Sequence, residues 1–274
     1  MPAQRPVIGV FDSGFGGLTV LKELVNLIPE ADYAYFGDTA RLPYGSKSAE
    51  TVSRYAVGAT QYLEQHGAEM LVVACNTATA LALNDVQQAS KVPVVGVVEP
   101  GAERAAAASK NGKVVVIGTE ATVSSHAYLK ALQARKIEAR EKACPLLVPL
   151  VEEGWVEHAV TEQVARIYLE EAFGEGFGNA DVLVLGCTHY PLIKSVLRRA
   201  APNHVTIVDS AESTAHVVWR KLKIEPLKTP ESPERRLHPR IRFFATDSVE
   251  KFKRLGPQFL GHAIENVQHV DLKE

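Results

Sequence analysis

The sequence has few of the features that mark extracellular, membrane or metal-binding proteins. It has three cysteines in 274 residues, an odd number without a C-x-x-C spacing, which argues against a disulfide framework or a structural zinc site. No apolar run approaches the roughly 20 residues that cross a bilayer. The first residues lack the apolar core and the cleavage site of a signal peptide. We therefore expect a cytoplasmic protein with reduced thiols and no membrane partner.

The chain also lacks an excess of charge of one sign. Its 30 Lys and Arg are balanced by 32 Asp and Glu, and no long run of like charge occurs, so we expect no nucleic-acid partner. Closely spaced His, Cys and carboxylate ligands are absent, and we expect no metal. A small-molecule substrate is the expected partner. With 46% apolar residues, the chain can bury the core of one or two domains.

Short aliphatic runs alternate with helical patterns along the chain. The runs are nearly continuous, as in strands that helices cover on both faces of a parallel sheet, so the fold class is α/β. Apolar residues spaced as i, i+3, i+4, i+7 and i+11 from Val52 predict an amphipathic helix between Ser48 and Gly67. The expected strands are 6–11, 31–37, 69–74, 92–98, 113–118, 144–150, 181–186, 205–209 and 240–246.

The two halves of the chain repeat one pattern. Residues 71–77 read "LVVACNT" and residues 183–189 read "LVLGCTH", so each half has a strand, a cysteine and polar residues. Asp38 precedes the first cysteine, and Glu152 the second, by nearly the same separation. This pattern favours an internal duplication into two pseudo-symmetric α/β domains with mainly parallel sheets. Ligands bind beyond the carboxyl ends of parallel strands, so the active site is expected in the cleft between the domains.

The domain division follows from composition. We expect residues 1–98 plus 208–274 to form a discontinuous N-terminal lobe and residues 99–207 to form the second lobe. The stretch rich in proline and charge that ends near residue 240 is expected to return the chain to the first lobe. The alternative is that the C-terminal segment is a loose appendix.

Cys75 and Cys187 are the candidate reactive groups. A cysteine that ends a strand and begins a helix lies near backbone N–H groups and the positive end of the helix dipole, which favour the thiolate. The alternative is that each fills space in the core, the role we assign to Cys144. Two thiols on opposite walls of one cleft could remove a proton from one face of a carbon and return a proton to the other. That reaction inverts a stereocentre.

Polar residues beside the cysteines fit a small zwitterionic or acidic substrate. The glycine-rich turn "DSGFGG" exposes N–H groups and the Ser13 hydroxyl to a carboxylate, and it does not match the dinucleotide fingerprint. Asn76, Thr77 and Thr188 could bind a carboxylate or ammonium, or could only cap helices. A turn at Pro43 and Gly45 could direct Tyr44 into the cleft, or could be an ordinary surface turn.

Asp12 and His189 are the candidate partners of the two thiols. Either could hold a thiol proton or the amino group of the substrate. Asp12 could instead cap a helix, and a histidine in isolation is more often structural. His189 comes two residues after a candidate catalytic cysteine, and this favours a functional role.

Four motifs together resemble the cofactor-independent aspartate/glutamate racemase family. They are Asp12-Ser13-Gly14, Pro43-Tyr44-Gly45, Cys75-Asn76-Thr77 and the run from Gly186 to Pro191, and the resemblance extends from about residue 6 to about residue 215. It implies two pseudo-symmetric α/β lobes and an isomerase that interconverts L- and D-glutamate without pyridoxal phosphate or another cofactor. It also implies that the product D-glutamate is used for peptidoglycan, and so for cell wall biogenesis and cell shape.

The resemblance also implies roles for individual residues. Cys75 would be the base for the D-enantiomer and Cys187 the base for the L-enantiomer, with Asp12 and His189 assisting them. Supporting roles would fall to Asp38, Thr122 and Glu152. The implied substrate contacts are Asp12, Ser13, Tyr44, Gly45, Asn76, Thr77, Thr119, Thr188 and His189.

Three other functions stay open. A related racemase could act on aspartate. A thiol hydrolase would use one cysteine as nucleophile with His189 as base, and it would not need the other cysteine. A two-lobed amino-acid-binding protein would need neither thiol. The sequence leaves the oligomeric state open between a monomer and a homodimer.

Overall fold

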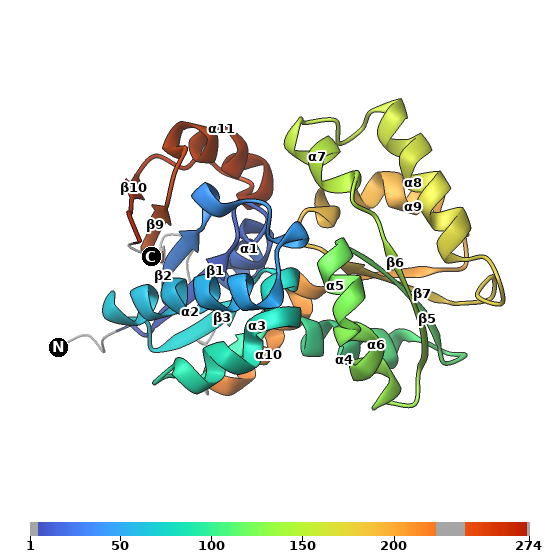
Figure 1. The fold of residues 1–274 in the computed structure, drawn as a ribbon, viewed down its shortest axis with the longest axis horizontal. Coiled ribbons are helices and arrows are strands. Elements are labelled where there is room, and N and C mark those ends of the chain that lie inside the picture. Colours follow the sequence, from blue (N-terminus) through green and yellow to red (C-terminus); the bar gives the residue numbers. More distant parts are fainter. Residues whose placement is uncertain (1–4, 223–238, 273–274) are drawn as a thin grey trace, which may run out of the picture.

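The computed structural model describes residues 5–222 and 239–272, which form two α/β lobes side by side (Figure 1). One lobe contains a six-stranded sheet of order β10-β9-β2-β1-β3-β4, and the other a four-stranded sheet of order β6-β5-β7-β8. All these strands pair in parallel. The expected fold class is therefore confirmed. Within the described ranges, none of the helices combines the length and the apolar character needed to span a membrane.

The first lobe is a sheet with helices on both faces. Helices α1 and α11 pack on one face and α2 and α3 on the other, in two separate buried clusters. Helix α2 begins after Ser48, whose side chain accepts a hydrogen bond from the Thr51 N–H, and it ends before Gly67, as expected. The elements are β1 (Val7–Asp12), α1 (Leu18–Leu27), β2 (Asp32–Gly37), α2 (Ala49–Gln65), β3 (Met70–Val73), α3 (Asn76–Ala89), β4 (Val94–Gly96), β9 (Ile241–Ala245), α11 (Val249–Leu260) and β10 (Val267–His269).

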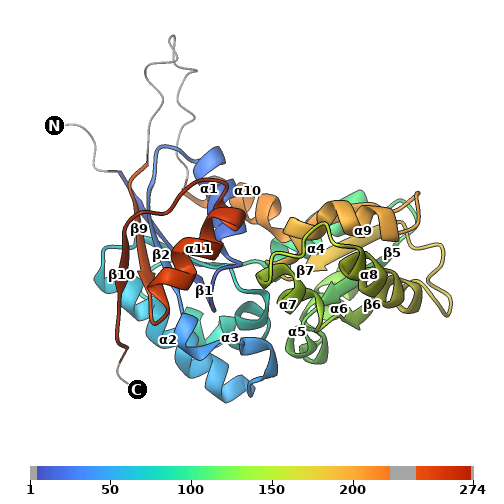
Figure 2. The same ribbon diagram turned by 90° about the horizontal axis from the view of Figure 1, so that it is seen from above.

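The second lobe has the same kind of architecture on a smaller sheet. Helix α10 lies at the junction, beside α1 of the first lobe and α4 of the second (Figure 2). Single 3-10 turns occur at Thr39–Arg41 and Tyr44–Ser46 in the first lobe and at Tyr190–Ile193 in the second. The elements are α4 (Val98–Ala108), β5 (Lys113–Gly118), α5 (Glu120–Ser125), α6 (Ala127–Gln133), β6 (Glu138–Ala143), α7 (Leu147–Glu152), α8 (Ala159–Ala172), β7 (Val182–Gly186), α9 (Lys194–Ala200), β8 (Thr206–Asp209) and α10 (Ser210–Leu222).

The strand order supports the expected pseudo-symmetry. The order β2-β1-β3-β4 in the first sheet matches β6-β5-β7-β8 in the second. Strands β9 and β10 extend the first sheet next to β2, so the C-terminal segment returns to the first lobe. The boundaries at 98/99 and 207/208 stay a prediction. Most of the stretch rich in proline and charge, at 223–238, lies outside the described residues.

The prediction of a strand at 144–150 is wrong. The strand at this place in the sheet is β6 at Glu138–Ala143, and residues Leu147–Glu152 form helix α7. Strand β6 is an edge strand, and none of its residues is fully buried, so its sequence is polar and gives no aliphatic signal. Leu147 and Val151 are buried four residues apart, which is a helical spacing, and Pro149 lies in the first turn, where helices tolerate proline.

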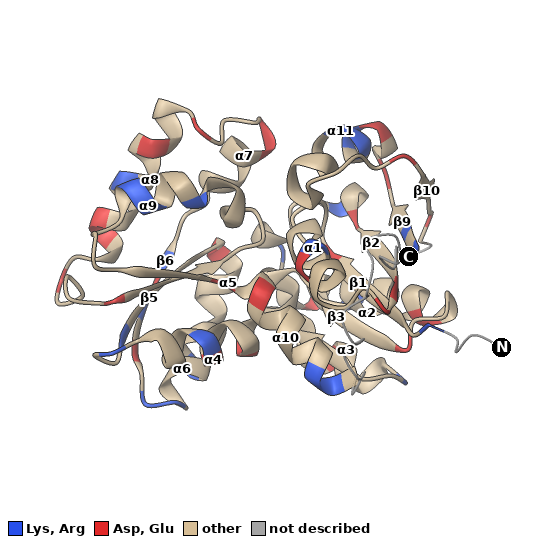
Figure 3. Ribbon diagram, turned by 180° about the vertical axis from the view of Figure 1, so that it is seen from behind, with Lys and Arg blue, Asp and Glu red and all other residues tan. Residues whose placement is uncertain are grey.

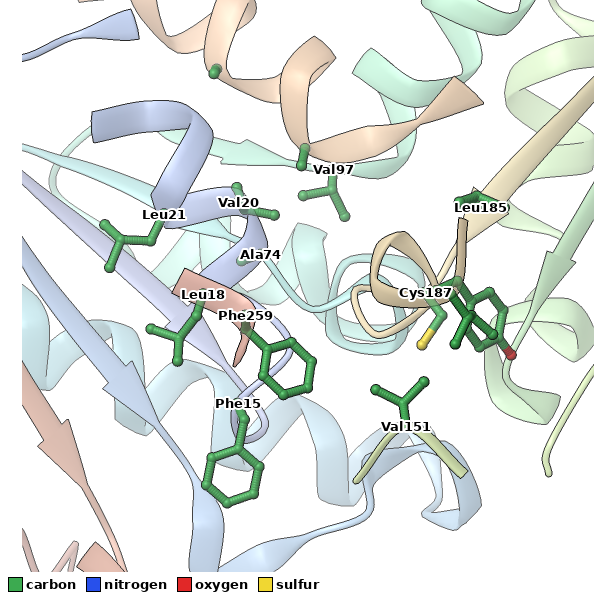
Figure 4. Packing of buried hydrophobic residues seen from close by; sticks show 14 of the residues in the cluster. Phe15, Leu18, Val20, Leu21, Ala74, Val97, Val151, Leu185, Cys187 and Phe259 are labelled. Carbon is green, nitrogen blue, oxygen red and sulfur yellow. The ribbon is translucent and has the colours of Figure 1, made fainter. Parts of the chain in front are cut away.

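The two lobes share part of their core. One buried cluster contains side chains of both lobes, and Figure 4 shows Phe15 and Leu18 of the first lobe with Val151 and Cys187 of the second. Positively and negatively charged residues are interspersed along the ribbon of both lobes (Figure 3). The shared apolar contacts fix how the carboxyl ends of the two sheets face each other.

Candidate active site

A cavity of about 380 Å³ lies between the lobes, beyond the carboxyl ends of the central strands. Its walls carry both candidate cysteines, Cys75 from the first lobe and Cys187 from the second. Asp12, Asp38 and Thr122 do not line the cavity but are buried behind residues that do. The other expected site residues that line it are Ser13, Tyr44, Gly45, Asn76, Thr77, Thr119, Glu152, Thr188 and His189.

Cys75 is the N-cap residue of helix α3, which follows strand β3. Its Sγ accepts a hydrogen bond from the Ala78 N–H at 3.4 Å and donates one to the Ser13 hydroxyl at 3.5 Å. Burial, with a smaller contribution from the nearby Asp12 charge, raises the pKa of Cys75 to about 12 despite these contacts. The helix N-terminus favours the thiolate, but burial outweighs it at this position. Cys75 holds its proton at neutral pH.

Asp12 ends strand β1 and is almost completely buried. Its Oδ2 accepts a hydrogen bond from the Gly14 N–H at 2.8 Å, and its Oδ1 has no protein partner. Burial raises the pKa of Asp12, although the charge of His189 and the N–H groups of Gly14 and Gly17 oppose this rise. The lone oxygen is a buried acceptor without a donor, an arrangement that native proteins usually avoid outside functional sites.

Cys187 follows strand β7 and is the first group in a chain of polar contacts. Its Sγ lies 4.0 Å from Nδ1 of His189, whose Nε2 lies 3.2 Å from Oε1 of Glu152. The other oxygen of Glu152, Oε2, accepts a hydrogen bond from Nζ of Lys251 at 3.2 Å. Thiol, imidazole, carboxylate and ammonium thus follow one another along the wall of the cavity.

The charged groups in this row of polar contacts set the protonation of His189 and Glu152. Burial alone would lower the pKa of His189, but its bonds to Cys187 and Glu152 outweigh burial and raise the pKa to about 10. Burial likewise raises the pKa of Glu152, but His189 and Lys251 outweigh it and hold the pKa below its ordinary value. His189 is therefore an imidazolium at neutral pH, with both ring nitrogens donating.

The raised pKa of His189 predicts a decline of stability in alkali. A group whose pKa is higher in the folded protein contributes stability that is complete below its unfolded value, about 6.5, and is lost as the pH rises toward about 10. We expect the free energy of unfolding in urea to fall between about pH 6.5 and about pH 9. The variant His189→Gln should show a flatter dependence over this range. Equal slopes for the two proteins would contradict the assignment of an imidazolium.

Hydroxyl and amide groups from both lobes meet in the cavity. The hydroxyls of Thr77 and Thr119 are 2.9 Å apart across the lobe boundary, and Thr119 is also 2.9 Å from Thr122. Oδ1 of Asn76 accepts a hydrogen bond from the Tyr128 hydroxyl at 2.8 Å, while its buried Nδ2 has no partner in the protein. Asn76 therefore offers an unused donor, as an anionic ligand would require.

Tyr44 points inward, but its hydroxyl is already used. It is 1% exposed, and the hydroxyl donates a hydrogen bond of 2.5 Å to Oδ2 of Asp38. Oδ1 of Asp38 accepts from the Thr246 hydroxyl at 2.8 Å and from Arg41 at 3.1 Å. Tyr44 thus lines the cavity without offering a free hydroxyl, and Asp38 supports the loop that carries it.

The two carboxylates that the sequence pairs are not equivalent in the structure. Asp38 directly follows β2 and is fully buried, whereas Glu152 ends helix α7 and lines the cavity. Lys251 was missed because it belongs to the C-terminal segment, and one lysine among 30 Lys and Arg gives no signal of its own. Among the described residues, no group of three or more His, Cys, Asp or Glu side chains could hold a metal ion.

Comparisons with known proteins agree on one family. A family model described as Asp/Glu/Hydantoin racemase matches residues 8–218. The glutamate racemase of Koribacter versatilis is 60% identical over 99% of both chains. A crystal structure of a Bacillus anthracis glutamate racemase has a TM-score of 0.88 and 39% identity, with 97% of this chain and 98% of that one covered. A Francisella tularensis glutamate racemase, solved with D-glutamate, has a TM-score of 0.86 and 34% identity, with 98% of both chains covered.

Proposed function

This chain belongs to the Asp/Glu/Hydantoin racemase family, and we propose that it is a glutamate racemase in which Cys75 and Cys187 are the two acid–base groups. The observation that carries the proposal is one cavity whose walls carry a cysteine from each lobe, with Cys75 in contact with Ser13 and Cys187 beside His189. An acid and a base of the same kind can exchange roles when the reaction reverses. No cofactor takes part in the proposed reaction.

The proton on Cys75 and the positive charge of His189 beside Cys187 fit one order of events for L-glutamate. In this order Cys187, whose Sγ lies 4.0 Å from Nδ1 of His189, takes the Cα proton of the substrate. The Cys75 thiol then delivers its proton to the opposite face of the carbanion, and D-glutamate forms. Cys187 ends as a thiol and Cys75 as a thiolate, so the reverse reaction starts from the state that the forward one leaves. The assignment of Cys187 to the L-enantiomer rests on the family resemblance.

The cavity also offers stabilisation of the carbanion. General acid–base catalysis contributes only about 10²- to 10⁴-fold, which is small for a Cα proton beside a carboxylate. The further stabilisation comes from fixed donors in a water-poor site, for which Nδ2 of Asn76 and the hydroxyls of Ser13 and Thr188 are placed. To keep water out of the site, the proposal includes closure of the two lobes over the substrate.

The names of the relatives support the proposed substrate, and the family resemblance supports the proposed biological role. Several relatives are named glutamate racemases, and the Francisella structure contains D-glutamate. The proposed role is to supply D-glutamate for peptidoglycan in the cytoplasm, where free thiols such as the three of this chain stay reduced. A homodimer stays a prediction.

Proton exchange in D₂O tests the activity. The protein without added cofactor should exchange the Cα proton of both L- and D-glutamate, followed by NMR, and the circular dichroism of either enantiomer should decay to zero. Aspartate is the control substrate and should react much more slowly. Exchange with aspartate alone would move the activity to an aspartate racemase, and no exchange without pyridoxal phosphate would refute the cofactor-free mechanism.

A thiol hydrolase is the second candidate, because Cys187, His189 and Glu152 are arranged as a nucleophile, a base and an orienting carboxylate. That function predicts a covalent acyl-enzyme on Cys187, which intact-protein mass spectrometry would detect with ester substrates. It gives Cys75 no role in the chemistry.

A further inference from the structure

Helix α11 of the C-terminal segment provides two contacts to the second-lobe wall of the cavity. Nζ of Lys251 bonds to Glu152 at 3.2 Å, and the ring of Phe259 meets the ring of His189 edge-on, with centroids 5.2 Å apart at 79°. Phe259 belongs to the same buried cluster as Cys187 (Figure 4). Helix α11 of the first lobe and helix α7 of the second lie on the facing sides of the two lobes (Figure 1). Both contacts therefore join the two lobes.

The ammonium of Lys251 is held in place from the first lobe. The next residue, Phe252, is fully buried and packs against the rings of Phe15 and Tyr35 at centroid distances of 5.6 and 5.9 Å. Nζ of Lys251 lies 5.4 Å from the centroid of the Phe15 ring, within the range of a cation–π contact. The buried Phe252 thus anchors the backbone next to Lys251, and the ring of Phe15 holds the ammonium of Lys251 beside the cavity.

Glu152 lies between two cations and uses a different oxygen for each. Oε1 faces His189 and Oε2 faces Lys251, so the lysine fixes which edge of the carboxylate meets the imidazole. Lys251 is the only Lys or Arg among the described residues that line the cavity. Without it, His189 would be the only cationic side chain among the described lining residues of a cavity that also carries Glu120, Glu152 and Glu153 and is proposed to admit a substrate with two carboxylates. Like charges raise the free energy of such a complex.

We propose that Lys251 is a positioning residue for the Cys187 side of the reaction. From the first lobe it holds Glu152 against His189, so the acid–base group of the second lobe is fully arranged only when the lobes are together. This inference rests on the proposed racemase function. Lys251 touches Glu152, and it acts on the thiol only through Glu152 and His189.

Three variants test the proposal by kinetics. Lys251→Met should lower kcat/KM for glutamate about three- to tenfold, as for a partly exposed ion pair, and mainly through kcat. The loss must be equal for L- and D-glutamate, because enantiomers have equal free energies. Lys251→Arg should restore most of the activity, since it keeps the charge. Lys253→Met is the matched control, because Lys253 lies on the same helix, pairs with Glu250 at 3.7 Å and does not line the cavity.

A second measurement does not depend on racemisation. Alkylation by iodoacetamide, resolved by peptide mass spectrometry, should slow several-fold at Cys187 in Lys251→Met and stay unchanged at Cys75, because the loss of the ammonium releases Glu152 and His189 from their positions beside Cys187 only. Melting temperatures of the variants should match that of the wild type. Wild-type kinetics and Cys187 alkylation in Lys251→Met would overturn the proposal, as would an arginine variant as impaired as the methionine variant. An inactive wild type would instead refute the racemase function, and alkylation would still test the link to Cys187.

Discussion

Replacing either Cys75 or Cys187 by alanine should abolish racemisation, with a loss in kcat of about 10³-fold or more, because each direction needs one thiol as base and the other as acid. Both cysteines line the cavity and come from different lobes, so neither can take over the other face of the substrate. Circular dichroism with L- and with D-glutamate measures the loss in each direction.

The third cysteine provides the matched control for these variants. Cys144 is fully buried but does not line the cavity, and its Sγ donates only to the Lys142 carbonyl at 3.6 Å. Cys144→Ala should keep near-normal activity. Full racemisation by Cys75→Ala would contradict the two-thiol mechanism, and an acyl-enzyme on Cys187 that forms equally in Cys75→Ala would point to the single-thiol hydrolase. If the wild type binds glutamate but does not turn it over, the chain would be a binding protein.

Substituting Gly16 by alanine should lower kcat about 10²-fold while the protein stays folded, because small misplacements of catalytic groups have effects of this size. A Cβ at this position would lie 2.2 Å from the Thr188 hydroxyl oxygen and 2.6 Å from Nδ1 of His189, both on the other lobe. Such distances are far below van der Waals contact, so the lobes or the His189 ring must move. Steady-state kinetics together with a melting curve separates this effect from unfolding.

Gly58 is the control glycine for this experiment. It lies within helix α2, and an added Cβ would meet no atom within 4 Å. Gly58→Ala should leave kcat unchanged and stabilise the fold by about 0.4 to 1 kcal/mol, because alanine loses less conformational freedom in a helix. Wild-type activity in Gly16→Ala would show that the lobes tolerate a wider separation than the close approach at Gly16 indicates.

The sequence by itself determined the class of fold and where its chemistry lies. The aliphatic runs around Val72 and Val184 are continuous because these strands are central in their sheets and buried on both faces. The carboxyl ends of parallel strands meet at one edge, so Cys75 and Cys187 could be placed at the cleft without coordinates. These inferences succeed because they depend on short segments and on one general property of parallel sheets.

The tertiary structure alone decided what depends on contacts distant in the sequence. Strand β6 has no aliphatic signal because it lies at an edge, and residues 144–150 are apolar because α7 buries one face. Cys75 keeps its proton because burial outweighs the helix N-terminus, and the sequence does not show how deeply a side chain is buried. Lys251 reaches the cavity because α11 packs across the cleft from Glu152, 99 residues away in the chain. Local patterns thus determine which segments form strands and helices, whereas burial and long-range packing determine protonation and the full set of groups around the two thiols.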